Sequence, residues 1–117
     1  MPTILIHSII CEHPQETDMD EIYIIYKGKK VWPKDQKFMK IDVDDTLPIG
    51  MKMKVNGKGW LKLELWEYDL TSKNDHLGTF HLKIDDSSGH FSEMLSTPDP
   101  RSPISYFLNW ELVQETE

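Results

Sequence analysis

Two alternating segments joined by an acidic loop constrain the fold of this chain more than any other feature. Leu61, Leu63 and Leu65 are separated by charged residues, and Leu82 and Ile84 repeat the alternation further along. A period of two indicates strands with one buried face. The loop between them carries a series of oxygen-bearing side chains, namely Glu67, Asp69, Thr71, Ser72, Asn74 and Asp75. Such side chains at the end of a strand pair are typical ligands of a hard cation, and calcium suits them best.

Short strands account for most of the remaining sequence. These segments are rich in β-branched and aromatic residues or alternate apolar with charged ones, and they are bounded by turn residues. Asn56 and Gly57 favour a tight hairpin between Gly50 and Trp66, because both central positions of that turn accept a positive φ. The further strands that we expect are Ile4–Cys11, Glu21–Tyr26, Lys30–Trp32, Phe38–Val43, Met51–Val55 and Ile104–Leu112.

About eight short strands without a helix of ordinary length predict an all-β fold. Regular spacing of strands and turns favours an antiparallel eight-stranded sandwich. Phe91, Met94 and Leu95 have roughly helical spacing, so we expect one short helical turn within a long loop. The 117 residues fit one domain, and we therefore expect residues 1–117 to form a single sandwich.

Charge and hydropathy exclude several classes of protein. A formal net charge of −7 disfavours nucleic-acid binding, which relies on basic surface. No apolar run approaches the roughly 18 residues of a transmembrane helix, and the start of the chain lacks the features of a cleaved signal peptide. Cys11 is the only cysteine, so no intrachain disulfide is possible. We expect a cytoplasmic or peripheral membrane location, and secretion without a cleaved signal peptide stays open.

Basic residues are concentrated in the middle of the chain. Ten lysines and only four acidic residues lie between Lys27 and Lys62, while the two ends carry most of the acid. Solvated strand faces are the ordinary explanation of such lysines. The alternative is a contact surface for an anionic phospholipid membrane or a protein partner. Its candidate residues are Lys27, Lys29, Lys30, Lys52, Lys54 and Lys62.

Little in the sequence favours catalysis. Cys11 with His7 or His13 would need a third group to orient the pair, and none is identified, so a buried core cysteine is the better interpretation. His76 and His90 are isolated, and no His or Cys spacing resembles a zinc site. No glycine-rich phosphate loop follows a strand. We therefore expect a binding module rather than an enzyme.

The stretch LELWEYDLTSKNDHLGTF resembles the signature of the C2 domain family, β-sandwiches that bind calcium and phospholipid. In that family an aliphatic strand leads into an aromatic, acid, aromatic, Asp pattern, then a Ser-rich loop ending in Asp, then an aliphatic residue and Gly. Glu67 stands where calcium-binding members usually have Asp. The matching positions here are Trp66, Glu67, Tyr68, Asp69, Ser72, Asn74, Asp75, Leu77 and Gly78.

A second acidic cluster, Asp18, Asp20 and Glu21, precedes an aliphatic and aromatic strand, in a way similar to the other acidic loop of that family. The resemblance implies that the two loops meet at one end of the sandwich and line an apical calcium site. The implied ligands are Asp18, Asp20, Glu67, Asp69 and Asp75, with Glu12, Glu16 and Asn74 as additional candidates.

Two hypotheses of function follow. In the first, bound calcium neutralises the acidic loops and thereby lets the module contact a phospholipid membrane or a partner. In the second, the chain is a calcium-independent protein-interaction or structural assembly domain that keeps the fold without the metal.

Overall fold

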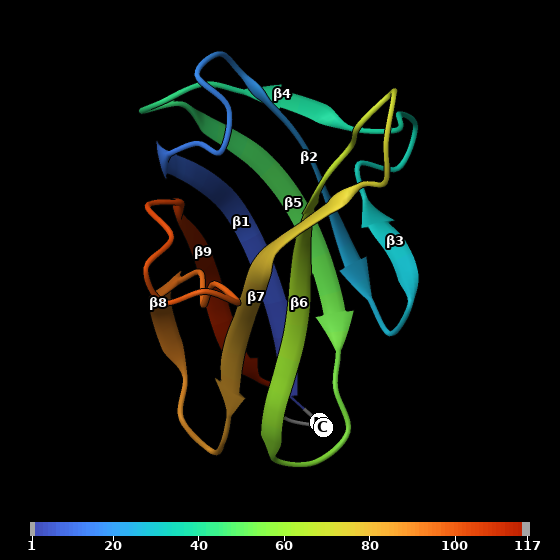
Figure 1. Ribbon diagram of the computed structural model, residues 1–117. Helices are drawn as coiled ribbons and strands as arrows, with labels where there is room; N and C mark the ends of the chain where they lie inside the picture. The colour runs from blue at the N-terminus through green and yellow to red at the C-terminus, as the bar shows by residue number, and fades with distance from the viewer. Residues whose placement is uncertain (1, 116–117) are drawn as a thin grey trace.

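Nine β-strands and no helix make up the described part of the chain, residues 2–115 of a computed structural model (Figure 1). The all-β prediction is confirmed, with one strand more than expected. No helix in this range is long and apolar enough to span a bilayer. The strands are β1 (Pro2–His13), β2 (Asp20–Tyr26), β3 (Lys29–Trp32), β4 (Met39–Ile41), β5 (Thr46–Lys54), β6 (Gly59–Glu67), β7 (Asp75–Ile84), β8 (Gly89–Met94) and β9 (Ser105–Gln114).

The strands form two antiparallel sheets that pack face to face as a sandwich (Figure 1). Sheet A has the order β5-β1-β9-β8, and sheet B has the order β3-β2-β6-β7, with the short β4 also paired to β2. Because all neighbours are antiparallel, the end of β6, the start of β2 and the start of β7 lie at the same end of sheet B. This arrangement decides where the acidic loops lie.

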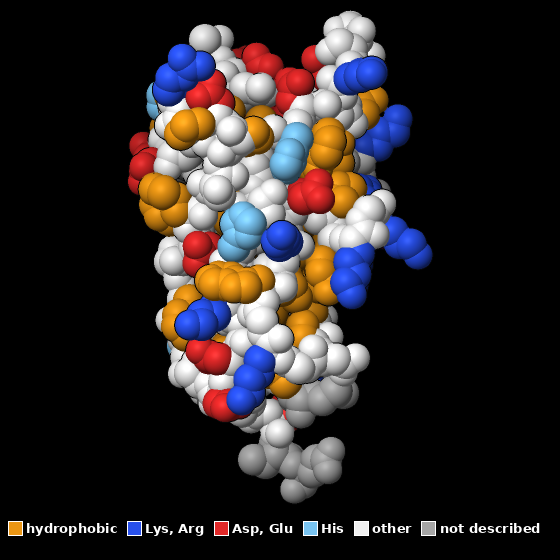
Figure 2. All heavy atoms as spheres, turned by 60° about the horizontal axis from the view of Figure 1, so that its bottom comes forward, with side chains coloured by type: hydrophobic (Ala, Val, Ile, Leu, Met, Phe, Trp, Pro, Cys, Tyr) orange, Lys and Arg blue, Asp and Glu red, His pale blue; other side chains and the backbone are white. Residues whose placement is uncertain are grey.

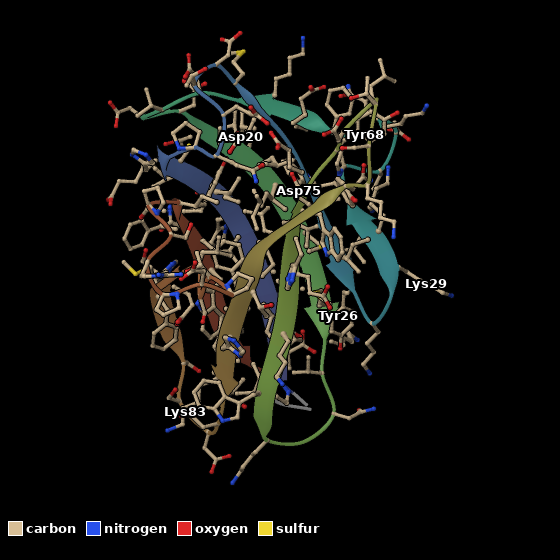
Figure 3. All side chains as sticks on the ribbon, viewed as in Figure 1. Asp20, Tyr26, Lys29, Tyr68, Asp75 and Lys83 are labelled. Carbon is tan, nitrogen blue, oxygen red and sulfur yellow. The ribbon has the colours of Figure 1, made fainter. Side chains whose placement is uncertain are left out.

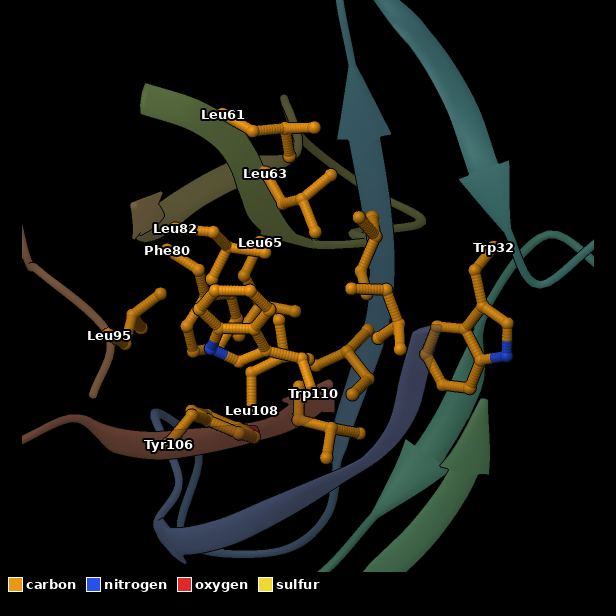
Figure 4. Packing of buried hydrophobic residues seen from close by; sticks show 14 of the residues in the cluster. Trp32, Leu61, Leu63, Leu65, Phe80, Leu82, Leu95, Tyr106, Leu108 and Trp110 are labelled. Carbon is orange, nitrogen blue, oxygen red and sulfur yellow. The ribbon is translucent and has the colours of Figure 1, made fainter. Parts of the chain in front are cut away.

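The core is built from the inward-facing rows of both sheets. Leu61, Leu63 and Leu65 of β6 are buried, as the period-two pattern predicts, and Leu108 and Trp110 of β9 pack against them from sheet A (Figure 4). Apolar burial of this kind stabilises by about 25 cal/mol per Å², so these rows supply most of the driving force for folding.

One sequence prediction is wrong: the segment around Phe91 is not helical. It forms β8, an edge strand that pairs with β9 from Gly89↔Leu112 to Met94↔Phe107. An edge strand has only one neighbour, and most residues of β8 are exposed, so it lacks the alternation that marks a half-buried strand. Two other boundaries also differ, since β5 begins earlier than expected, at Thr46, and β4 covers only Met39–Ile41.

The two sheets are joined along one side by a backbone contact. Thr79 of β7 and Ser96, just beyond β8, exchange two backbone hydrogen bonds of 2.9 Å. The neighbouring Gly78 lies so close to this segment that a Cβ atom added there would be 2.5 Å from the Ser96 carbonyl oxygen. Only glycine permits this close approach of backbone to backbone.

Candidate functional site

The two acidic loops lie at the same end of the molecule, which we call the acidic tip (residues 14–19, 42–45 and 68–74). Glu67 is the register partner of both Ile22 and Asp75, and the Tyr68 amide donates to the Glu21 carbonyl oxygen at 2.8 Å. Figure 3 shows Asp20, Tyr68 and Asp75 in the upper part of the molecule. The predicted convergence of the loops is therefore confirmed.

A third acidic loop joins this end. The segment 42–45 connects β4 to β5, and the amide of Asp44 donates to the Cys11 carbonyl oxygen at 2.7 Å. The Cys11 amide in turn donates to the Asp45 carbonyl oxygen at 3.0 Å. Asp42, Asp44 and Asp45 consequently lie beside the end of β1, a position that sequence reasoning did not assign to the tip.

Asp20 points into the core rather than toward solvent. Its side chain is fully buried, because Asp20, Ile22 and Ile24 alternate along β2 and share the inward face. One carboxylate oxygen accepts the Glu16 amide at 2.9 Å, and the other accepts the Gln15 amide at 2.8 Å and the Tyr106 hydroxyl at 2.5 Å. These donors fold the 14–19 loop back over the buried carboxylate.

Glu67 also faces inward, for the same reason. It continues the row of Leu61, Leu63 and Leu65 along β6, and its side chain is only 4% exposed. Burial, reinforced by the negative charge of Asp20, raises the pKa of Glu67 to about 8. Near neutral pH the Glu67 carboxyl therefore holds a proton next to the Asp20 carboxylate.

Two further buried groups complete this network. Cys11 and Tyr106 are register partners on β1 and β9, and both side chains are fully buried. Burial raises the pKa of the Cys11 thiol to about 11, so the prediction of a core cysteine is confirmed and the thiol is a poor nucleophile. Burial and the hydrogen bond to Asp20 raise the pKa of Tyr106, which keeps its hydroxyl available as a donor.

The 68–74 loop is organised by its own hydrogen bonds. The Asp69 carboxylate accepts the Ser72 hydroxyl at 2.7 Å and the Thr71 amide at 3.0 Å, and these bonds lower the pKa of Asp69. Asn74 accepts the Asp69 amide at 2.9 Å and donates to the Tyr23 hydroxyl at 2.7 Å. This is the pattern of an Asx turn, in which the polar side chains shape the loop.

The remaining predicted ligands occupy the outside of the tip. Asp18 and Asp75 are exposed, and the exposed Glu12 accepts the Ser105 hydroxyl at 3.1 Å. Glu16 is exposed and contributes its backbone amide to Asp20. The tip thus combines an exposed rim of carboxylates with a buried pair beneath it.

The five predicted ligands do not form a preformed calcium site in this geometry. Calcium needs six to eight oxygens at about 2.3 to 2.6 Å, whereas both Asp20 oxygens already accept hydrogen bonds and Glu67 carries a proton. Within residues 2–115, one group of three metal-binding side chains has all its ligand atoms within 4.8 Å of one another, and it lies outside the tip, at His7, His90 and Glu111.

The predicted lysines lie toward the other end of the strands. A cleft of about 500 Å³ runs between the β2–β3 turn and the β5–β6 hairpin, and its lining includes Lys27, Lys54 and Lys62. We call it the lysine cleft. Figure 2 shows lysine and arginine side chains gathered along the right-hand edge, the side on which Figure 1 places β3. Lys29 and Lys30 stand beside the cleft in the turn region, and Lys52 lies one exposed position before Lys54 on β5.

Two residues of the lysine cleft were not predicted from the sequence. Lys58 lines it and pairs with Asp86 at 2.7 Å, which raises the pKa of Lys58. Trp60 also lines the cleft, and its side chain is 63% exposed. The Asn56–Gly57 hairpin was a signal for this position, because residues that flank a hairpin turn reach the end of the sheet.

Comparison with known proteins supports the fold. No family model and no curated protein matches the sequence. Among solved structures, the first C2 domain, domain A, of plant extended synaptotagmin 1 is similar with a TM-score of 0.60 and 12% identity, over 99% of this chain and 95% of that chain. Another structure, a C2 domain, gives the same TM-score and identity over 97% of this chain and 99% of that one. The chain therefore has the fold of a C2 domain.

Proposed function

We propose that this chain is a non-catalytic binding module that contacts an anionic phospholipid surface through the lysine cleft without a resident metal ion. The observation that carries the proposal is the combination of Lys27, Lys54 and Lys62 with the exposed indole of Trp60 around one cleft. Each lysine near an anionic membrane contributes about 1 kcal/mol of attraction, so the three together give a useful affinity.

The exposed tryptophan favours a membrane over an acidic protein as the partner. Trp side chains are enriched at membrane interfaces, where the ring sits at headgroup level with its N–H in a polar setting. A large apolar side chain that is 63% exposed next to lysines has no packing role in the sandwich itself. The distribution of charge agrees, since the acidic tip lies at the opposite end of β2 and β6 and would point away from the membrane.

The buried acids favour binding that does not need calcium. The Asp20 carboxylate is satisfied by three donors, and the Glu67 carboxyl is neutralised by a proton, so this part of the tip is stable without a cation. A calcium ion would have to displace those donors and that proton.

Vesicle co-sedimentation in the presence of a calcium chelator tests the proposal. The native chain is expected to sediment with phosphatidylserine vesicles but not with phosphatidylcholine vesicles. The double variant Lys54→Glu, Lys62→Glu is expected to lose most of this binding. The matched control is Lys34→Glu, Lys73→Glu, which changes the net charge equally at exposed positions outside the cleft. Equal binding of the two variants would overturn the proposal, and so would binding that appears only with calcium.

A second candidate, calcium binding at the acidic tip, is favoured by the convergence of three acidic loops there. Asp18, Asp69 and Asp75 would be the outer ligands, with Asp20 and Glu67 behind them after loss of the Glu67 proton. Calorimetry with calcium up to about 1 mM, the weak end of protein calcium sites, tests this candidate. An absence of heat together with an unchanged melting temperature would exclude it. If neither vesicles nor calcium bind, the protein-interaction hypothesis is the one that remains.

A further inference from the structure

We propose that His7, His90 and Glu111 form a binding site for a transition-metal ion of the Zn²⁺ class on the outer face of sheet A. This metal site is independent of both the acidic tip and the lysine cleft. It also corrects the sequence interpretation that His90 is isolated and that no zinc-like spacing exists, because the three residues are brought together only by the fold.

The pairing of the strands explains how the three residues meet. His90 of β8 is the direct register partner of Glu111 of β9, so their side chains share one face. On the other side of β9, the register of β1 shifts between Ile6↔Trp110 and Ser8↔Asn109, which leaves His7 as the extra residue of a β-bulge. A bulge redirects a side chain, and here it directs His7 toward Glu111.

The distances suit a metal ion. The two carboxylate oxygens of Glu111 each face one imidazole, at 3.0 Å from His7 Nε2 and at 3.7 Å from His90 Nε2. In a tetrahedral site with bonds of about 2.0–2.1 Å, neighbouring ligand atoms are about 3.4 Å apart. The observed separations bracket this value, and the two imidazole rings are stacked with centroids 5.8 Å apart. Small rotations of exposed side chains would complete the geometry.

The ligand types define the class of ion. Two imidazoles and one carboxylate form the set that open zinc sites use, and imidazole nitrogen favours Zn²⁺ and Cu²⁺ over the oxygen-preferring Ca²⁺ and Mg²⁺. A cleft of about 360 Å³ adjoins the histidines and includes Ser92 and Asn109 in its lining. A fourth position, for water or a donor from a partner, is therefore accessible.

Calorimetric titration of the tag-free chain with Zn²⁺ tests the proposal. One equivalent is expected to bind, with an accompanying shift of the His7 and His90 imidazole signals in NMR. His7→Ala and His90→Ala are each expected to weaken zinc binding by about tenfold or more, and Cu²⁺ is expected to bind more tightly than Zn²⁺.

The matched control is His81→Ala, which removes a histidine from β7 on sheet B. It is expected to leave zinc binding unchanged, and Ca²⁺ and Mg²⁺ are expected to give no shift of the His7 and His90 signals. Equal affinity of the native chain and the His90→Ala variant would overturn the proposal, as would a titration in which no zinc binds. Neither result would affect the vesicle-binding proposal, since no residue of this site lines the lysine cleft.

Discussion

The Tyr106 hydroxyl donates a hydrogen bond to the buried Asp20 carboxylate across 86 positions of sequence, and this bond connects the two sheets beneath the acidic tip. Asp20 belongs to sheet B and Tyr106 to sheet A, so the pair fixes the relative position of the sheets at that end. A buried charge of this kind is stable only while its donors are present.

Tyr106→Phe is expected to destabilise the fold. The substitution keeps the ring and leaves one Asp20 oxygen with a single donor, a loss that costs about 1–3 kcal/mol for a buried charged acceptor. Urea denaturation at neutral pH measures it. Tyr26→Phe, at the lysine cleft, is the control and is expected to change stability little. Equal midpoints for the two variants would contradict the structural role of the Asp20–Tyr106 bond.

Stability is expected to fall as the pH rises from about 5 to about 8. The pKa of Glu67 is about 8 in the folded chain against an ordinary value of 4.5, so between these values the folded state binds the extra proton. The slope from this one group approaches about 1.4 kcal/mol per pH unit in the middle of that range. Denaturant midpoints measured from pH 5 to pH 9 check it.

Glu67→Gln is the companion variant, because the amide mimics the protonated carboxyl. It is expected to match the native chain at pH 5 and to exceed it in stability at pH 9. A native chain whose stability rises over this range would show that Glu67 is ionised in the folded state.

Gly78→Ala is expected to destabilise the chain by about 1–3 kcal/mol, the usual cost of overpacking a rigid site. The new Cβ would lie 2.5 Å from the Ser96 carbonyl oxygen and 2.7 Å from Leu95 Cγ, and the first of these is backbone that cannot rotate away. Ser96→Ala is the control, because the Thr79–Ser96 contact uses backbone atoms only. Thermal melting distinguishes the two, and equal melting temperatures would mean that the contact is loose.

Trp60→Ala is expected to weaken vesicle binding several-fold, whereas Leu70→Ala is expected to leave it unchanged. Both residues are large, apolar and exposed, at 63% and 84%, but Trp60 borders the lysine cleft and Leu70 lies on the acidic tip. The comparison therefore reports which end of the molecule meets the membrane. Loss of binding in Leu70→Ala alone would assign the contact to the tip, as the calcium hypothesis requires.

Much of the fold was predictable because period-two alternation is a local property. It located β1, β2, β6 and β9, and the hairpin dipeptide Asn56–Gly57 located the turn that leads into β6. The edge strand β8 escaped prediction because one neighbour and two exposed faces impose no alternation. The approach of the two acidic loops was also predictable, since antiparallel strands return to the same end.

The site was less predictable, and Asp20 and Glu67 explain why. Each stands at the end of an alternating apolar row, so the pattern that identified the strands also indicated that both carboxylates face inward. The resemblance to a calcium-binding signature assigned them to the surface instead. The partners that stabilise them, above all Tyr106, are remote in sequence, as are His7 and Glu111, which meet only through a bulge that no local pattern records.

The position of β5 has a consequence for how copies of this protein meet. It is the outermost strand of sheet A and pairs with β1 alone among the described strands, so its other side offers backbone groups on which a second molecule could polymerise. Pro48 has no amide hydrogen to offer there, and the charges of Lys52 and Lys54 repel an identical strand. The same lysines that we assign to lipid contact thus guard against fibre growth, and neutral replacements would remove both protections at once.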